Sequence, residues 1–216
     1  MKDIGILMTE FPDLWVPSAG LPRFAVPFGR DSLSTSLETL VWNPHLAHDV
    51  LRFLARVQGK EENPYNYEQP GKILHEMHTG ELARLGEIPF GLFYGSVDST
   101  VLFLMVAAEY ITWTGDLDLY RELKPNFDAA WAWIDKYGKI DGSGYIQYKA
   151  HTPPKMSSAA LTVGLFNQGW KDSANAVSYS DGTNVYRPSG RAGRGPRLPV
   201  PCSSLVGETL RRDAGI

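Results

Sequence analysis

The sequence predicts a mainly α-helical fold, on two observations. Apolar residues recur three and four positions apart in four stretches, which is the spacing of one helix face, and no series of alternating strands is visible. Of the 216 residues, 43% are hydrophobic and 21% are charged, with a net charge of −3. This is the composition of a globular protein that can bury a core.

The first two predicted helices lie close together in the chain. One covers residues 31–41, with Asp31 or Ser32 placed to cap its start. The next begins after Pro44, because proline suits the first position of a helix, and it stops at Gly59.

Two further helices are predicted downstream. Residues 100–114 are apolar on almost every side, and a helix of that kind is buried all round. The last helix begins at Pro125 and ends at Gly138. The glycine-rich residues 141–144 then predict a turn, followed by a short extended piece.

Loops rich in glycine, aromatic and charged residues precede the helical segments. They are Phe28–Ser32, His75–Glu81, Tyr94–Thr100 and Asn167–Ser173. If alternate helices point the same way, these loops gather at one end and can build a single pocket. Simple capping of helix ends by Asp31 and Asp98 is the alternative interpretation.

The same loops carry the groups that glycoside hydrolysis requires. Breaking a glycosidic bond needs one carboxyl group to protonate the leaving oxygen and a second to activate water or to attack. The candidate carboxyl groups are Asp31, Glu76, Glu81, Asp98 and Asp172. The side chains suited to bind sugar hydroxyls, or to stack on sugar rings, are Arg30, His75, His78, Tyr94 and Trp170.

Other chemistries find less support. His75 and His78 lie near Glu76, but their spacing is not the zinc-binding His-Glu-x-x-His pattern, so we expect no metal and no cofactor. There is no nucleophile elbow or phosphate-binding glycine loop. The weak net charge argues against nucleic acid, and no apolar run is long enough for a membrane span. With a single cysteine, Cys202, and no signal-peptide core, we expect a cytoplasmic protein.

Residues 187–216 differ in kind from the rest. They contain six arginines and no aromatic residue. A disordered tail is the favoured interpretation, because such a composition cannot bury a core. A short arginine–glycine tract for RNA and a segment translated out of frame are the alternatives. The sequence thus divides into residues 1–186 and this tail.

The motifs in residues 3–186 resemble, in order and spacing, those of bacterial amylo-α-1,6-glucosidases, which are glycogen debranching enzyme-like proteins. The motifs are Ala19–Phe24, Phe28–Leu33, Gly71–Glu76, Thr79–Glu81, Tyr94–Thr100 and Asn167–Ser173. The resemblance implies an (α/α)6 six-hairpin toroid, incomplete in this chain, that acts on α-linked glucose in an oligosaccharide or α-glucan.

The resemblance also implies roles for individual residues. Arg30 and Asp31 are similar to the pair that grips the terminal glucose in glucoamylase-like sites. Asp172 is similar to the general acid that follows a Gly-Trp pair in related trehalases, with Trp170 and Lys171 beside it in the substrate site. Lys171 is in tension with this role, because a nearby cation disfavours the protonated acid.

The departures from the family matter as well. Its general base, usually a glutamate, lies in later helices of the toroid, and its upstream β-rich domain has no counterpart here. We therefore expect a truncated enzyme. The alternatives are another toroid glycosidase of trehalase or mannosylglycerate hydrolase type, a sugar-binding module without turnover, and a helical toroid with a function unrelated to sugars.

Overall fold

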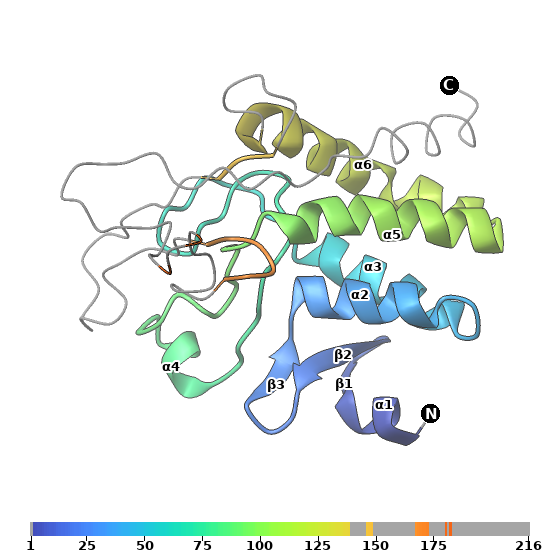
Figure 1. Ribbon diagram of the computed structural model, residues 1–216, viewed down its shortest axis with the longest axis horizontal. Coiled ribbons are helices and arrows are strands. Elements are labelled where there is room, and N and C mark those ends of the chain that lie inside the picture. The colour runs from blue at the N-terminus through green and yellow to red at the C-terminus, as the bar shows by residue number, and fades with distance from the viewer. Residues whose placement is uncertain (1, 139–145, 149–166, 173–179, 181, 183–216) are drawn as a thin grey trace.

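The computed structural model (Figure 1) describes residues 2–138, 146–148, 167–172, 180 and 182. Helices make up about half of these residues, so the fold is mainly α with a small sheet. The elements in chain order are α1 (Lys2–Leu7), β1 (Met8–Phe11), β2 (Leu14–Gly20), β3 (Phe24–Pro27), α2 (Gly29–Thr39), α3 (Pro44–Arg56), α4 (Glu81–Arg84), α5 (Asp98–Thr114), α6 (Leu117–Trp133) and the π-helix η1 (Ile134–Gly138).

The sequence shows no series of strands, but the structure has three of them in the first 27 residues. An antiparallel sheet in the order β1-β2-β3 forms there. Its outer strands have four residues each, too few to show an alternating pattern. Only β2 alternates, with Leu14 and Val16 buried on either side of the exposed Trp15. The two buried residues join the core beneath α2 and α3.

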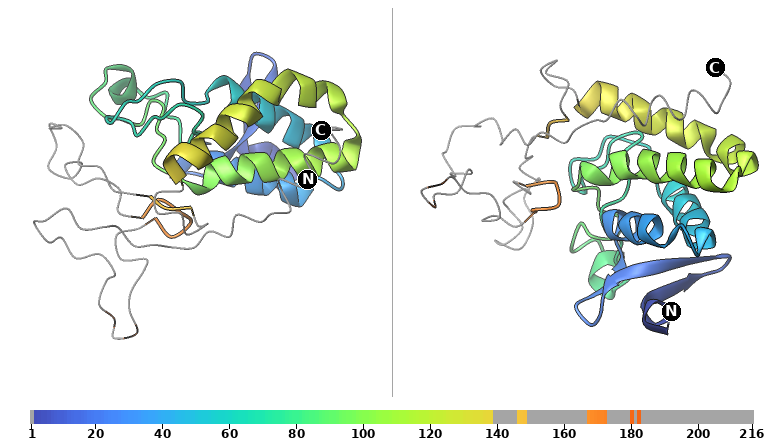
Figure 2. Two further views of the ribbon diagram at one scale, coloured as in Figure 1. Left: turned by 90° about the horizontal axis from the view of Figure 1, so that it is seen from above. Right: turned by 45° about the vertical axis from the view of Figure 1, so that its right-hand side comes forward.

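Four long helices form two antiparallel hairpins. The first hairpin, α2 and α3, covers the sheet, and the second, α5 and α6, lies on the side away from the sheet (Figures 1 and 2). Helices α2 and α5 are in contact and run in the same direction (Figure 1). Their N-terminal ends therefore lie at the same end of the molecule.

The helix boundaries correct several expectations. Neither Asp31 nor Ser32 caps α2: the helix begins earlier, after Phe28, which makes no side-chain cap. Ser32 instead donates from its hydroxyl to the carbonyl of Pro17, which ties α2 to the sheet.

The last long helix also begins earlier than the sequence predicts. Helix α6 begins after Asp116, whose carboxylate accepts a hydrogen bond from the backbone N–H of Leu119. Pro125 consequently lies inside the helix, on its exposed side.

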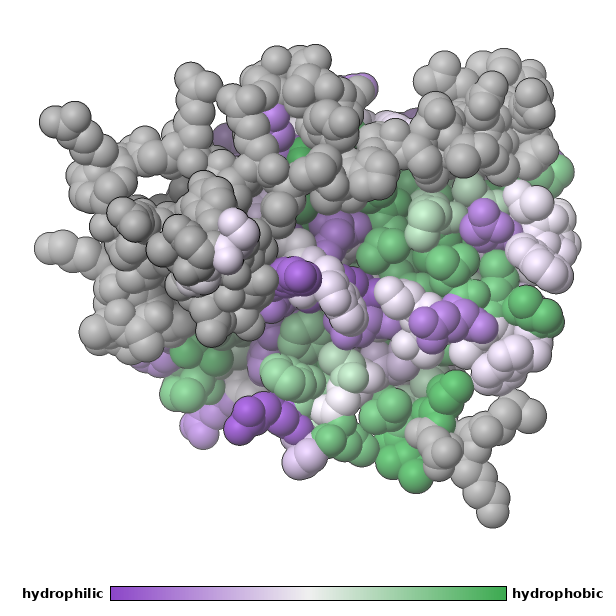
Figure 3. All heavy atoms as spheres, viewed as in Figure 1, coloured by the Kyte–Doolittle hydropathy of each residue, from purple (hydrophilic) through white to green (hydrophobic). Residues whose placement is uncertain are grey.

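Helix α5 is buried on most sides but not on all of them. Phe103, Leu104 and Ala107 are inaccessible to solvent, whereas Val101 and Met105 are half-buried among the described residues. Figure 3, which has the same view as Figure 1, shows hydrophobic residues at the surface in the region of α5. Helix α5 does not have the length and apolar character needed to cross a bilayer, and neither does any other described helix.

The predicted turn at residues 141–144, the boundary near residue 186 and the arginine-rich tail lie outside the described residues.

Candidate active site

The N-terminal ends of α2 and α5 bring two of the candidate residues together. Arg30, in the first turn of α2, donates from Nη1 to Oδ2 of Asp98, in the first turn of α5, at 2.9 Å. Asp98 does not cap its own helix, since Val97 holds the cap position without a side-chain bond. The expectation that these two loops converge is confirmed. Asp98 forms an ion pair with Arg30, and it does not cap α5.

A third loop joins the same arginine. Nη2 of Arg30 donates to Oδ2 of Asp172 at 3.0 Å. The guanidinium carbon also lies 5.4 Å from the ring centre of Trp170, within the range of a cation–π contact. Three segments separated by up to 142 residues thus meet at one side chain.

Arg30 is buried, and its two partners differ in exposure. Burial opposes the charge of the guanidinium, but the ion pairs with Asp98 and Asp172 outweigh it, so the pKa of Arg30 lies above its usual value. The side chain of Asp98 is 14% exposed and that of Asp172 is 40% exposed. Asp98 is therefore the inner anchor of Arg30, and Asp172 is the partner nearer to solvent.

Two further carboxyl groups lie near this cluster and favour the protonated form. Burial raises the pKa of Asp31, and the charge of Arg30 opposes that rise. Burial also raises the pKa of Glu76, against its hydrogen bond to His78 at 3.1 Å. The charge of Asp172 raises both pKa values further, so all these carboxyl groups share one electrostatic environment.

His75 packs inside the wall of the site. Its ring lies edge-on to Phe28 and to Phe93. Burial, with the nearby charges of Arg30 and Lys72, lowers the pKa of His75 to about 3, so the ring is neutral.

The segment that carries His75 and Glu76 is held against α2 by a close backbone approach. Gly29 donates from its N–H to the carbonyl of His75 at 2.8 Å. A Cβ at Gly29 would lie 2.0 Å from the carbonyl oxygen of Leu74. Only glycine fits at position 29. The close contact between Gly29 and Leu74 fixes the position of Arg30, the next residue, relative to Glu76.

Three residues placed in the site by the sequence are not brought to it. Tyr94 is 1% exposed and donates its hydroxyl to the carbonyl of Val57 at 2.7 Å, so it offers no stacking face. Glu81 is exposed at the start of α4. Lys171 is exposed, and the cation in contact with Asp172 is Arg30.

The two histidines of the site contact other side chains of the protein. His78 pairs with Glu76, and His75 is enclosed by aromatic rings. Across the described residues, no group of three or more His, Cys, Asp or Glu side chains is arranged to hold a metal ion.

Several buried polar atoms of the site lack a hydrogen-bond partner among the described residues. They are Nε of Arg30, Oδ1 of Asp98 and Nδ1 of His75. An unpaired buried donor or acceptor costs free energy. The three atoms are enclosed by the protein, so the cost is borne by the structure around Arg30 itself.

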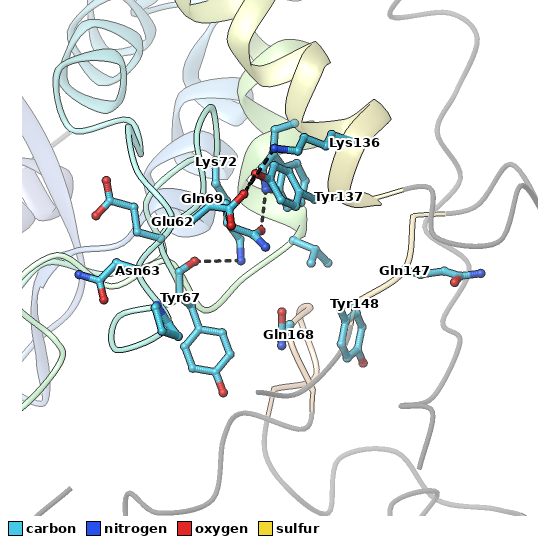
Figure 4. A pocket seen from close by; sticks show the side chains of 14 residues that line it. Glu62, Asn63, Tyr67, Gln69, Lys72, Lys136, Tyr137, Gln147, Tyr148 and Gln168 are labelled. Carbon is cyan, nitrogen blue, oxygen red and sulfur yellow. Dashed lines mark hydrogen bonds and ion pairs between the residues drawn. The ribbon is translucent and has the colours of Figure 1, made fainter. Parts of the chain in front are cut away.

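A cavity of about 470 Å³ adjoins this site, and Val97 and Gln168 from two of the site loops line part of it. None of the candidate site residues lines it, and Lys72, which does, received no role from the sequence (Figure 4). A buried lysine has no periodic signature, and the only hint was its position between a glycine and the apolar pair Ile73–Leu74.

No protein-family model matches the chain, and no curated protein matches it either. The resemblance to debranching enzymes therefore stays a prediction from the motifs.

Proposed function

We propose that the chain is a glycoside hydrolase domain that acts on α-linked glucose in glycogen-like α-glucans, with Asp172 as the general acid. The observation that supports this most is the meeting of Asp98, Asp172 and Trp170 at the buried Arg30. Carboxyl groups, an arginine and an aromatic face are the groups that bind and cleave sugars.

The two ion pairs of Arg30 have different roles in this proposal. Asp98, the more buried partner, keeps the guanidinium in place. Asp172 is the exchangeable partner, because its carboxylate is the more exposed one. When sugar hydroxyls accept hydrogen bonds from Arg30, they replace Asp172 on Nη2 and release it toward the leaving oxygen.

This exchange is needed because a carboxylate held on Nη2 of Arg30 is not free to reach the leaving oxygen, and a general acid has to lie within hydrogen-bond reach of that atom. Glu76 is the competing donor, since burial already favours its protonated form. We assign no general base among the described residues. Asp98 is held by Arg30, and neither Asp31 nor Glu76 is shown beside a position for an attacking water.

The helix arrangement agrees with a toroid of helical hairpins. Two antiparallel hairpins pack with the N-terminal ends of α2 and α5 together, and the candidate residues cluster at those ends. In the proposed (α/α)6 architecture, each added hairpin contributes another loop to the same end.

Hydrolysis of a glucoside panel by the full chain tests the proposal. Because the resemblance implies a truncated enzyme without its general base, we expect slow glucose release, with α-1,6-linked glucosides preferred to trehalose and mannosylglycerate. Asp172→Asn should reduce the rate by about 10²–10⁴-fold, the usual contribution of acid catalysis. Lys171→Gln, at the neighbouring exposed residue, is the control and should stay within about threefold.

A sugar-binding module without turnover is the second candidate. It is favoured by the ion pair that keeps Asp172 on Arg30 in this structure. In that case the chain would bind an α-glucooligosaccharide without releasing glucose, and Arg30→Gln would abolish binding while Glu81→Gln left it unchanged. Absence of both binding and hydrolysis would contradict either function.

A further inference from the structure

A cavity of about 470 Å³ lies between the loop of residues 62–72, the C-terminal end of α6 with η1, and residues 146–148 (Figure 4). Its volume is within the range of small-molecule sites. Its walls combine aromatic rings, amides and charged side chains, among them Tyr67, Glu68, Trp133, Tyr137, Tyr148 and Gln168.

Lys72 lines this cavity as a buried cation without an opposite charge. It is 3% exposed, and its amine makes one long hydrogen bond, 3.4 Å, to the carbonyl of Tyr67. The amine also lies 5.6 Å from the ring centre of Trp133. No carboxylate of the described residues forms an ion pair with Lys72, and burial lowers its pKa to about 7.

The backbone forces Lys72 into this position. Gly71 has a positive φ of 87°, and a Cβ there would lie 2.1 Å from the carbonyl oxygen of Ala129 in α6. The loop is thus pressed against α6 at Gly71. The N–H of Gly59 donates to the carbonyl of Lys72 at 2.9 Å, which fixes the loop on its other side. These contacts fix the backbone of Lys72, from which the side chain extends into the wall of the cavity.

A second polar group on the same cavity is also unsatisfied. The hydroxyl of Tyr148 is buried and has no hydrogen-bond partner among the described residues. The backbone N–H of Gln168 lies near it without the geometry of a hydrogen bond. The ring of Tyr148 lines the cavity, but its hydroxyl is enclosed and points away from Lys72 (Figure 4). A buried polar group of either kind is costly to leave unpaired.

We propose that this cavity binds a sugar that carries an anionic group, a carboxylate or a phosphate, with the anion on Lys72. Trp133 and Tyr137 supply apolar surface for the ring, and Glu68 can accept hydrogen bonds from its hydroxyls. An anion supplies the charge that Lys72 lacks, which a neutral sugar cannot do. The cavity adjoins the cluster around Arg30, but Arg30, Asp98, Asp172 and Trp170 do not line it, so this inference does not depend on the proposed hydrolase function.

Calorimetric titration of the full chain with glucose, glucuronate and glucose 6-phosphate at constant ionic strength tests the inference. We expect at least one anionic sugar to bind about tenfold or more tightly than glucose, and Lys72→Met to remove that preference. The two anionic probes distinguish a carboxylate ligand from a phosphate ligand. Equal affinity for glucose and both anions, or a preference that survives in Lys72→Met, would overturn it.

The matched control is Lys136→Met. Lys136 also lines the cavity, but it is exposed and pairs with Glu62. The anion preference should change by less than about threefold in this variant. An equal loss in both lysine variants would indicate general charge attraction and would contradict a site on Lys72.

A measurement on the unmodified chain covers the case in which Lys72→Met fails to fold. The lysines are reductively methylated with and without each probe, and Lys72 is followed by mass spectrometry. We expect the anionic sugar to protect Lys72 by about tenfold and to leave Lys136 unprotected. Protection by glucose to the same extent, or by none of the probes, would refute the inference.

Discussion

Arg30 and Lys72 are both buried basic side chains, but they differ in the opposite charges around them. Arg30 has two carboxylates within 3.0 Å, whereas no described carboxylate pairs with Lys72. The pKa of Arg30 is accordingly raised, and that of Lys72 is lowered to about 7. The paired charge of Arg30 holds three loops together. The unpaired charge of Lys72 reduces the stability of the fold unless a bound anion neutralises it.

The largest expected effect comes from removing the compensated cation. Arg30→Met leaves Asp98 buried without a counter-charge, and we expect the free energy of unfolding to fall by about 3–5 kcal/mol. Urea unfolding measures this. Arg121→Met, at the exposed pair with Asp118, is the control and should change stability by less than about 1 kcal/mol. Similar losses in the two variants would remove the distinction between a buried and an exposed arginine.

A somewhat smaller loss is expected from displacing Arg30 without touching its charge. Gly29→Ala places a Cβ 2.0 Å from the carbonyl oxygen of Leu74, so the two segments must separate. We expect a loss of about 1–3 kcal/mol together with weaker sugar binding. Gly20→Ala, where nothing lies within 4 Å of the added atom, should be nearly neutral. A neutral Gly29→Ala would show that this approach does not position Arg30.

Removal of the uncompensated cation should have the opposite sign. We expect Lys72→Met to be neutral or more stable than the natural chain by about 1–4 kcal/mol at pH 6, where the amine is charged in the folded and unfolded states. Between pH 7 and 10.5 the unfolded chain keeps the proton that the folded chain has released, so the natural chain gains stability with pH.

The gap between the natural chain and Lys72→Met should therefore narrow as the pH rises. Urea unfolding of both proteins from pH 6 to 9.5 checks this, below the range where tyrosines ionise. A gap that stays constant or widens would mean that Lys72 finds a counter-charge within the chain.

The smallest effect concerns Glu76, a buried acid beside the compensated cation. Its raised pKa means that ionisation costs the folded state stability as the pH rises above the usual value of a glutamate. We expect the stability of Glu76→Gln relative to the natural chain to increase from pH 4 to pH 7. Glu81→Gln, at an exposed carboxylate, should show a flat difference in thermal melts over the same range. A flat profile for Glu76→Gln would contradict the raised pKa of Glu76.

The sequence could predict the helices and the meeting of loops better than the contacts within the site. The mainly α fold follows from long periodic segments, whereas β1 and β3 are too short for a pattern, and their pairing is set by contacts with β2. The start of α6 was missed because Pro125 resembles a helix beginning, although Asp116 supplies the actual cap.

Within the site, the residue types were predictable and their partners were not. Arg30 and Asp172 were both expected there, but their ion pair depends on how two distant loops fold. Tyr94 is excluded from the site by burial, which its sequence context did not reveal. Lys72 could not be found, because a lone buried lysine is visible only once the cavity around it is known.

The central claim is that Asp172 donates the proton in hydrolysis of an α-linked glucoside at the Arg30 site. The most direct measurement is the rate of glucose release from an α-1,6-linked glucooligosaccharide by the natural chain, Asp172→Asn and Glu76→Gln. We expect Asp172→Asn to lose about 10²–10⁴-fold and Glu76→Gln to lose less than about tenfold. Full activity in Asp172→Asn, or the larger loss in Glu76→Gln, would contradict the claim.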